Sequence, residues 1–362
     1  MNHNGLLFSC RALCVMLMIL FLNSGCEHRP LEIMSMADNL FVRVYFNENI
    51  RNVSFGFYDE TKKKPEYYSP LMMRVVFCDE ASGKVVAERY LSDCGKDEQG
   101  YYIQGPMSVP QGRYDMMAYN FDTRYTKIKG DNLYSSMTAY TKLLSEPEVK
   151  KLFTSRGVLS VSEKINRQPD HLFVAKVEGV NVSLPDSKEP DTLKVENSQF
   201  PVAETVVKTY YMQINVKGVE YVRSAVALVS GMSGSKTLHD GEMIKDDVTS
   251  IFFGLNNGVE KYRANNETSA PTVAYATFNT FGKLPHEEGY LDITFEFNTI
   301  DNKVQIETFR ITDIWDTPQV KDNQWIIIDK VIEIIPPDDV DVGGGMRPGV
   351  DDWDVIEGII TI

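Results

Sequence analysis

Apolar and polar residues alternate at every second position through most of this 362-residue chain, and this constrains its fold more than any other feature. Successive side chains of a β-strand point to opposite faces, so the alternation is typical of strands with one buried face. Leu40–Phe46 (LFVRVYF) is the clearest example. The pattern recurs at 53–58, 72–78, 85–91, 101–103, 113–119, 170–176, 179–184, 206–217, 224–229, 249–255, 273–278, 291–297, 304–311 and 325–335. We predict an all-β protein made of antiparallel sandwiches.

Three segments interrupt the strands. Ser145 precedes 146–153 with Pro147 in the first turn, which predicts one short helix capped by Ser145. The proline-flanked segment 185–191 and the Gly/Ser-rich segment 230–235 predict loops. We place a domain boundary after residue 198, so that residues 26–198 and 199–362 form two β-sandwich domains.

The N-terminus predicts a signal peptide over residues 1–25. Arg11 is followed by an apolar run of 11 residues, Ala12–Leu22, which is too short for a stable transmembrane helix of about 20 residues. Asn23-Ser24-Gly25-Cys26 resembles the lipobox of bacterial lipoproteins, although Asn23 stands where leucine is usual. We therefore expect Cys26 to be lipidated and to begin a mature outer-membrane lipoprotein. The alternative is an ordinary secretory signal followed by a chance cysteine.

Cys78 and Cys94 are the two cysteines that remain in the mature chain besides the lipidated Cys26. A turn near 81–83 places Cys78 opposite about position 86, so a Cys78–Cys94 disulfide requires the chain after Leu91 to fold back. We favour two buried thiols, and a Cys78–Cys94 disulfide is the alternative. No Cys/His spacing predicts zinc.

Charge and motifs argue against nucleic-acid binding and catalysis. The chain has 37 Lys+Arg and 51 Asp+Glu, a net charge of −14, and no basic run longer than 62–64. The glycines at 343–345 lack the Lys-Ser/Thr of a phosphate loop. His239-Asp240, the segment 286–288 and the acidic residues around 338–352 are best interpreted as solvated loops. We expect no catalytic residue, no metal ligand, no cofactor and no enzymatic activity.

The C-terminal region carries an apolar strand behind a glycine-rich linker at 343–349. Such a strand needs a pairing partner, either the protein's own sheet or a groove in a neighbouring subunit. The candidate donor-strand residues are Trp353, Val355, Ile356, Ile359, Ile360 and Ile362.

Several short motifs resemble the fimbrillin-like lipoproteins of Bacteroidales, the subunits of type V fimbriae. They are 113–123 (RYDMMAYNFDT), 226–235 (VALVSGMSGS), 277–282 (TFNTFG) and 350–353 (VDDW), together with the lipobox and the final strand. The resemblance implies two tandem transthyretin-like β-sandwich domains. It also implies a cell-surface anchor, tip or accessory subunit whose partners are other fimbrial subunits and a host or bacterial surface ligand.

The resemblance also implies a role for Arg51, and a separate short resemblance implies one for Thr192. In stalk members an arginine-specific protease removes the first strand, and Arg51 is the candidate cleavage site here; a plain exposed arginine is the alternative. Asp191-Thr192-Leu193 resembles a short O-glycosylation motif of Bacteroidetes, which makes Thr192 the candidate acceptor. The alternative functions are a surface glycan-binding lipoprotein of the outer membrane and, less favoured, a secreted hydrolase.

Overall fold

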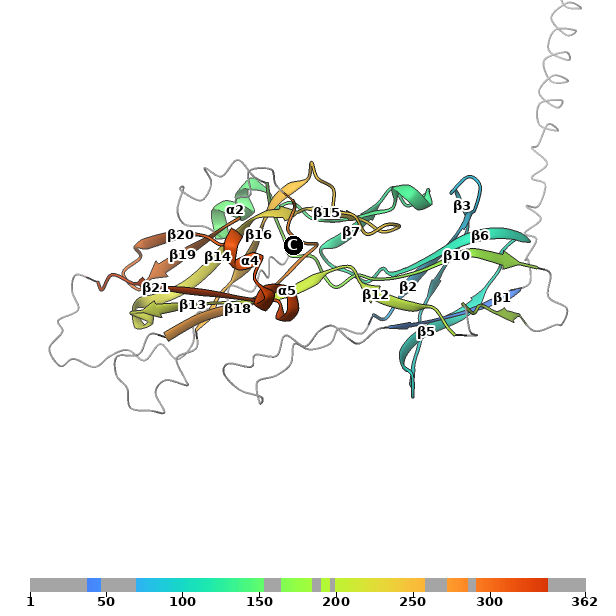
Figure 1. Ribbon diagram of the computed structural model, residues 1–362, viewed down its shortest axis with the longest axis horizontal. Helices are drawn as coiled ribbons and strands as arrows, with labels where there is room; N and C mark the ends of the chain where they lie inside the picture. Colours follow the sequence, from blue (N-terminus) through green and yellow to red (C-terminus); the bar gives the residue numbers. More distant parts are fainter. Residues whose placement is uncertain are drawn as a thin grey trace, which may run out of the picture. The chain divides into compact units, whose positions relative to one another are not determined.

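The computed structural model of the protein describes residues 38–46, 70–152, 164–183, 190–195, 199–257, 272–285 and 291–337. They belong to one compact unit that begins at Asp38. Strands make up most of it, which confirms the predicted all-β fold (Figure 1). No helix within these ranges is both long and apolar enough to cross a membrane.

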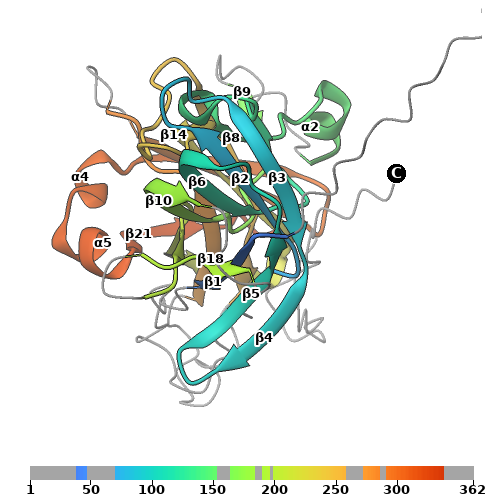
Figure 2. The ribbon, with the colours of Figure 1, turned by 90° about the vertical axis from the view of Figure 1, so that its right-hand side faces the viewer.

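The strands of the N-terminal part form one sheet in the order β3-β2-β6-β10-β12-β1-β5-β4, with β11 beside β1 (Figure 2). Inward side chains from β2, β6 and β10 and from β1 and β5 meet in one apolar core, so the two ends of the sheet face each other. The strands are β1 (Leu40–Phe46), β2 (Met73–Asp79), β3 (Val85–Leu91), β4 (Asp93–Asp97), β5 (Gly100–Met107), β6 (Gly112–Asn120), β10 (Phe173–Val182), β11 (Asp191–Thr192) and β12 (Val202–Thr205).

The strands of the C-terminal part form two sheets that share a second core. One sheet has the order β17 (Asn256–Asn257), β18 (Thr272–Thr280), β13 (Lys208–Lys217), β21 (Trp325–Glu333). The other has the order β20 (Val304–Arg310), β19 (Asp292–Thr299), β14 (Val222–Ser233), β16 (Val248–Gly254), β9 (Lys164–Asn166). The helices α4 (Thr312–Trp315) and α5 (Pro318–Asn323) connect β20 to β21, which runs parallel to β13.

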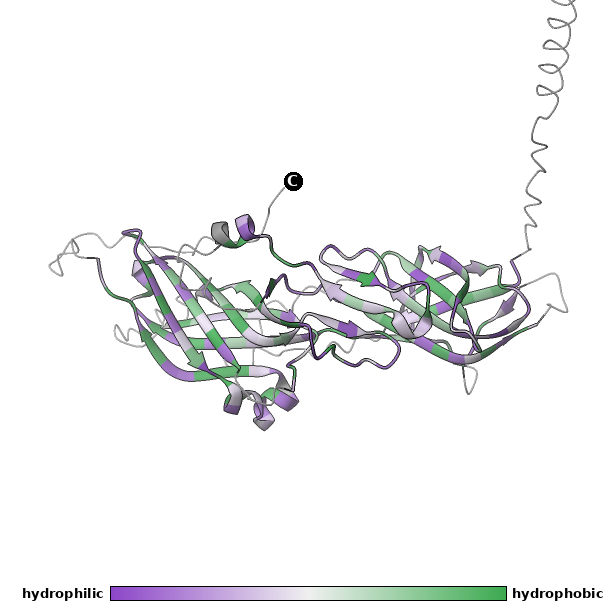
Figure 3. Ribbon diagram, turned by 90° about the horizontal axis from the view of Figure 1, so that it is seen from above, coloured by the Kyte–Doolittle hydropathy of each residue, from purple (hydrophilic) through white to green (hydrophobic). Residues whose placement is uncertain are grey.

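Aromatic rings fill this second core. Phe253 and Phe278 stack with centroids 4.5 Å apart, and Tyr210 lies 4.6 Å from Trp315. Apolar and polar residues alternate along the strands, as the hydropathy colours show (Figure 3). One face of each such strand is therefore buried, as the sequence pattern predicts.

A third, small sheet covers the other face of β2, β6 and β10. It has the order β15 (Ser235–Thr237), β8 (Thr138–Thr141), β7 (Thr126–Lys129), with a 3-10 turn at Tyr134–Ser136. Val76, Met117 and Tyr119 on the covered face pack against Met137 and Leu238. Consequently β2 is buried on both faces, which explains its near-continuous apolar sequence.

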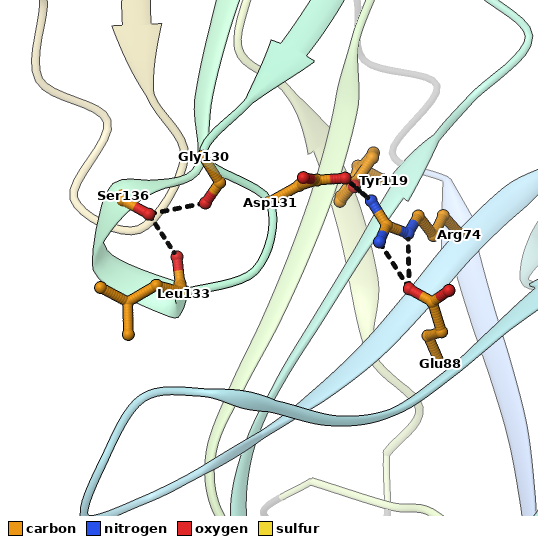
Figure 4. A network of polar contacts seen from close by, with 7 residues as sticks. All are labelled: Arg74, Glu88, Tyr119, Gly130, Asp131, Leu133 and Ser136. Carbon is orange, nitrogen blue, oxygen red and sulfur yellow. Dashed lines mark hydrogen bonds and ion pairs between the residues drawn. The ribbon is translucent and has the colours of Figure 1, made fainter.

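Arg74 of β2 links this cover to the sheet (Figure 4). Its guanidinium donates to the Tyr119 hydroxyl at 2.7 Å, to Glu88 of β3 and to Asp131 in the β7–β8 connection. The Ser136 hydroxyl in the same connection donates to the Gly130 carbonyl at 2.6 Å. Burial disfavours the charge of Arg74, but the bonds to Glu88 and Asp131 outweigh it and raise the pKa of the guanidinium.

The predicted helix is confirmed as α2 (Glu146–Leu152), but the loop predicted at 230–235 is wrong. That segment is the end of β14 and the start of β15. Gly231 adopts a positive φ of 70° at a bulge between Val229 and Met232, and this lets small, buried residues continue the strand.

The strands predicted at 170–176 and 179–184 are one strand, β10, bulged at Gly179. The predicted strand 53–58 lies outside the described residues, and the predicted boundary after residue 198 stays a prediction.

The N-terminus of α2 is held by a carboxylate at its third position. The backbone N–H and the hydroxyl of Ser145 both donate to Glu148 at 2.7 Å, and Arg167, just after β9, donates to the other Glu148 oxygen at 2.9 Å. The Ser145 backbone bond first, then the Ser145 hydroxyl and Arg167, lower the pKa of Glu148 to about 2. This carboxylate therefore ties α2 to the strand that pairs with β16.

We predict that Glu148→Gln destabilises the fold at pH 7 by about 1–2 kcal/mol, the usual range for a lost helix cap. Because the folded-state pKa is depressed, the stabilisation is fully present above about pH 4.5 and is lost as the pH falls toward 2. Urea unfolding should show a smaller difference in the free energy of unfolding between wild type and variant at pH 3 than at pH 7. Glu98→Gln, at an exposed turn, is the control; an equal difference at both pH values would contradict the prediction.

Candidate functional site

β1 is bonded to the sheet along both of its edges. It pairs antiparallel with β5 through six residues, Leu40 to Tyr45. Its other edge pairs parallel with β11 at Leu40 and Phe41 and with β12 at Tyr45 and Phe46. Because β12 also pairs with β10, β1 is the strand that connects β5 and β4 to the rest of the sheet.

The inward face of β1 is a continuous part of the core. Leu40, Val42, Val44 and Phe46 are 6 %, 0 %, 0 % and 7 % exposed. Burying each such side chain contributes about 1.5–3 kcal/mol, so the four together contribute about 6–12 kcal/mol. That sum is comparable with the whole stability of a domain, about 5–15 kcal/mol. We call the position that β1 fills in this sheet the β1 slot. The core is complete only when a strand with apolar residues at alternate positions occupies it.

The outward face of β1 is held by a cation between aromatic rings. The Arg43 guanidinium carbon lies 4.3 Å from the centroid of Tyr102 on β5 and 5.3 Å from that of Phe200. The Tyr45 hydroxyl donates to Asp97 of β4 at 2.6 Å. Burial, helped by this hydrogen bond, raises the pKa of Tyr45, and the same bond lowers the pKa of Asp97. These contacts join β1 to β4, β5 and the segment before β12.

The N-terminal end of β1 is fixed by side chains. The Asn39 amide donates to the Val109 carbonyl at 2.7 Å and its oxygen accepts from the Val109 N–H at 2.9 Å. Asp38 pairs with Arg89 of β3 at 2.8 Å. These bonds tie the first two described residues to β3 and to the segment that follows β5.

The predicted site residues divide between the described and the undescribed parts of the chain. Cys26, Arg51 and the donor strand 353–362 lie outside the described residues. Thr192 lies in β11 and is exposed, with its backbone opposite Phe41 of β1. The segment predicted as a loop up to residue 191 thus ends in a strand beside β1, with Thr192 accessible.

Cys78 and Cys94 are both free thiols, which confirms the favoured interpretation. The predicted burial is right only for Cys78, whose pKa burial raises to about 11. Cys94 is exposed because β4 is the outermost strand of its sheet. Cys78 lies opposite Val85, one position from the predicted register, because a bulge follows Phe77.

No group of three metal-ligating side chains occurs in the described ranges. His239 pairs with Asp240 at 3.0 Å, and no third ligand among the described side chains accompanies them. His286, its neighbours 287–288 and the acidic residues at 338–352 lie outside those ranges.

The sequence analysis did not predict the contacts of Arg43 and Asn39. Alternation marks Arg43 as outward-facing, but it does not identify the residues that Arg43 contacts.

Comparisons with known proteins cover most of the chain. A family model described as "Domain of unknown function (DUF5119)" matches residues 62–253, 192 of the 362 residues. A candidate fimbrium anchoring subunit of Bacteroides ovatus, Fim4B, is 26% identical over 308 residues, covering 78% of this chain and 82% of that protein. The crystal structure of a candidate adhesin from Bacteroides ovatus matches with a TM-score of 0.52 and 21% identity, covering 82% of this chain and 93% of that one. The last match shows that the fold is shared.

We predict that Arg43→Gln weakens the attachment of β1 and lowers the free energy of unfolding by about 1 kcal/mol, the usual size of a partly buried cation–π contact. Arg113→Gln is the matched control, because Arg113 makes only an exposed ion pair with Glu80 at 3.2 Å. Urea unfolding and hydrogen exchange at Val42 and Val44 would measure the effect. Arg43 also donates to Gln104 at 2.8 Å and pairs with Asp97 at 3.6 Å, so equal losses in the two variants would show that all the contacts of Arg43 together contribute no more than an exposed ion pair.

Proposed function

The chain belongs to the family described as Domain of unknown function (DUF5119), and from this premise we propose that it is a structural subunit of a bacterial surface fimbrium. The observation that carries the proposal is the similarity to the candidate fimbrium anchoring subunit, which extends over 78% of this chain and 82% of that protein. The role is anchor, tip or accessory, without catalysis. The partners are other fimbrial subunits and the outer membrane.

Attachment to the membrane would use a lipid on Cys26. Cys26 precedes Asp38 by 12 residues, which span about 40 Å at most when fully extended. The bonds of Asp38 and Asn39 then transmit load from this tether into the sheet rather than into a free loop. Acyl chains on Cys26 would give stable anchoring.

Assembly would proceed by strand addition. β1 shows the shape of an acceptor slot: four apolar side chains at alternate positions inside and main-chain bonds along both edges. In the C-terminal segment, Ile356, Gly358, Ile360 and Ile362 repeat this spacing. The proposal is that this segment enters a slot of the same kind in a neighbouring subunit.

Cleavage at Arg51 would link anchoring to assembly. Arg51 follows β1 in the sequence, so one cut there would separate both Cys26 and β1 from the rest of the chain. An anchor therefore stays uncut and keeps β1, whereas a cut subunit would lose its lipid and open the slot. O-glycosylation of Thr192 would occur on the exposed face of β11, beside that slot.

We predict that the mature protein begins at lipidated Cys26, and that Cys26→Ala abolishes both palmitate labelling and membrane retention. Mass spectrometry of the purified N-terminus distinguishes this from a chain that begins at Asn52. Arg51→Ala is the matched variant: it leaves an anchor unchanged. An unlipidated mature N-terminus in the wild type would contradict the anchor role.

We also predict that Ile356→Asp, Ile360→Asp and Ile362→Asp together abolish recovery of the protein in high-mass surface assemblies. Burying these charges in an apolar slot costs several kcal/mol. The matched control changes Glu357→Gln and Thr361→Ser on the opposite face of the strand. Unchanged assembly of the triple variant would rule out strand donation by this segment.

A further inference from the structure

A pocket of about 670 Å³ is lined by residues of α4, α5 and β15 and of the segments beside them, and its volume is well within the size of small-ligand sites. Its lining comes from the start of β13, from β15 and the turn after it, from residues 281–285, and from α4 and α5. None of its lining residues belongs to β1 or to the strands that pair with β1. It is thus a separate site.

The pocket is basic although the chain is acidic. Its described lining holds four lysines, Lys208, Lys236, Lys283 and Lys321, and one acidic residue, Asp316, for a net charge of 4 − 1 = +3. The net charge of the chain is −14. Lys283 pairs with Asp316 at 3.3 Å, whereas neither Lys208 nor Lys321 has an ion-pair partner within the described part of the chain.

Lys236 is the most constrained of these cations. It projects from β15, is half-buried, and its ammonium donates to the Val206 carbonyl at 3.2 Å. Burial first, and then the charge of Lys208, lower the pKa of Lys236. Burial and the charge of Lys208 both disfavour the charged form of Lys236, and a bound anion would oppose both effects.

The floor of the pocket is formed by three aromatic side chains. Tyr210, Phe281 and Trp315 are 5 %, 2 % and 6 % exposed. The Tyr210 hydroxyl and the Trp315 indole N–H are hydrogen-bonding groups of this floor, and neither is among the fully buried polar atoms that lack a partner in the described structure. A ligand that reaches the floor can bond to both.

The wall beside Phe281 requires a glycine. Gly282 has a φ of 134°, and a Cβ there would lie 2.8 Å from the Met243 sulfur. Gly282 and Met243 both line the pocket. Only glycine lets the backbone at position 282 lie this close to Met243, because any other residue would place a Cβ against the Met243 sulfur. This close approach fixes the shape of the wall.

We propose that this pocket binds a carboxylate-bearing saccharide. The lysines would hold the carboxylate, the floor would contact the C–H face of the sugar ring, and the Tyr210 hydroxyl and Trp315 N–H would bond to its hydroxyls. An extended polyanion such as nucleic acid is disfavoured, because the chain as a whole carries a net charge of −14. The site goes beyond the proposed assembly role and does not depend on it.

The test uses the full chain and isothermal titration calorimetry with oligogalacturonate, neutral dextran and poly-glutamate as probes. We expect oligogalacturonate to bind, and binding to weaken as NaCl rises from about 50 to about 300 mM. Lys208→Gln with Lys236→Gln should weaken it about tenfold, equivalent to ~1.4 kcal/mol. Lys236→Arg should retain it, and Lys330→Gln, an exposed lysine outside the pocket, is the matched control.

An unchanged thermal unfolding temperature of the double variant would show that its loss of affinity comes from the pocket and not from unfolding. Three results would overturn the proposal: no binding of oligogalacturonate, equal binding of dextran, or equal affinity in the double variant and the wild type. Binding of poly-glutamate in place of the saccharide would overturn the saccharide assignment and identify an acidic peptide as the ligand. The Ile356, Ile360 and Ile362 variant separates this site from assembly, because it should bind oligogalacturonate normally.

Discussion

The insertion of β1 between β5 and the short strands β11 and β12 is the contact on which the N-terminal core depends. Without β1 the sheet order is broken between β12 and β5, and the inward faces of both would be open to water. The strand is held in three ways at once, by main-chain bonds on both edges, by four buried side chains and by the outward Arg43 contacts. Main-chain bonds accept any sequence, so the alternate apolar side chains are what would select a replacement strand.

The small sheet β15-β8-β7 has a second structural role. It buries the outer face of β2, β6 and β10, and the charged bonds of Arg74 hold its β7–β8 connection in place. Its strand β15 also supplies Lys236 to the basic pocket. The same strand that completes a core therefore fixes a cation at the pocket, and loss of this cover would disturb both.

The two sites use different chemistry. The β1 slot relies on backbone pairing and apolar burial, which ionic screening does not weaken, whereas the pocket relies on ammonium groups, whose attraction falls with ionic strength. They also draw on different residues, so assembly and ligand recognition need not compete. A surface fibre subunit of the proposed kind could carry both.

The sequence by itself determined the local structure. Alternation located β1, β3 and most other long strands, and Ser145 with Pro147 located α2, because these signals act through neighbouring residues. Only the tertiary structure decided what each strand pairs with. Small buried residues at 230–235 continue a strand that their composition disfavours, and Cys94 is exposed because its strand is at an edge. Lys208 and Lys321 line the same pocket although 113 residues separate them in the sequence (321 − 208), an arrangement set by long-range sheet pairing that no local pattern encodes.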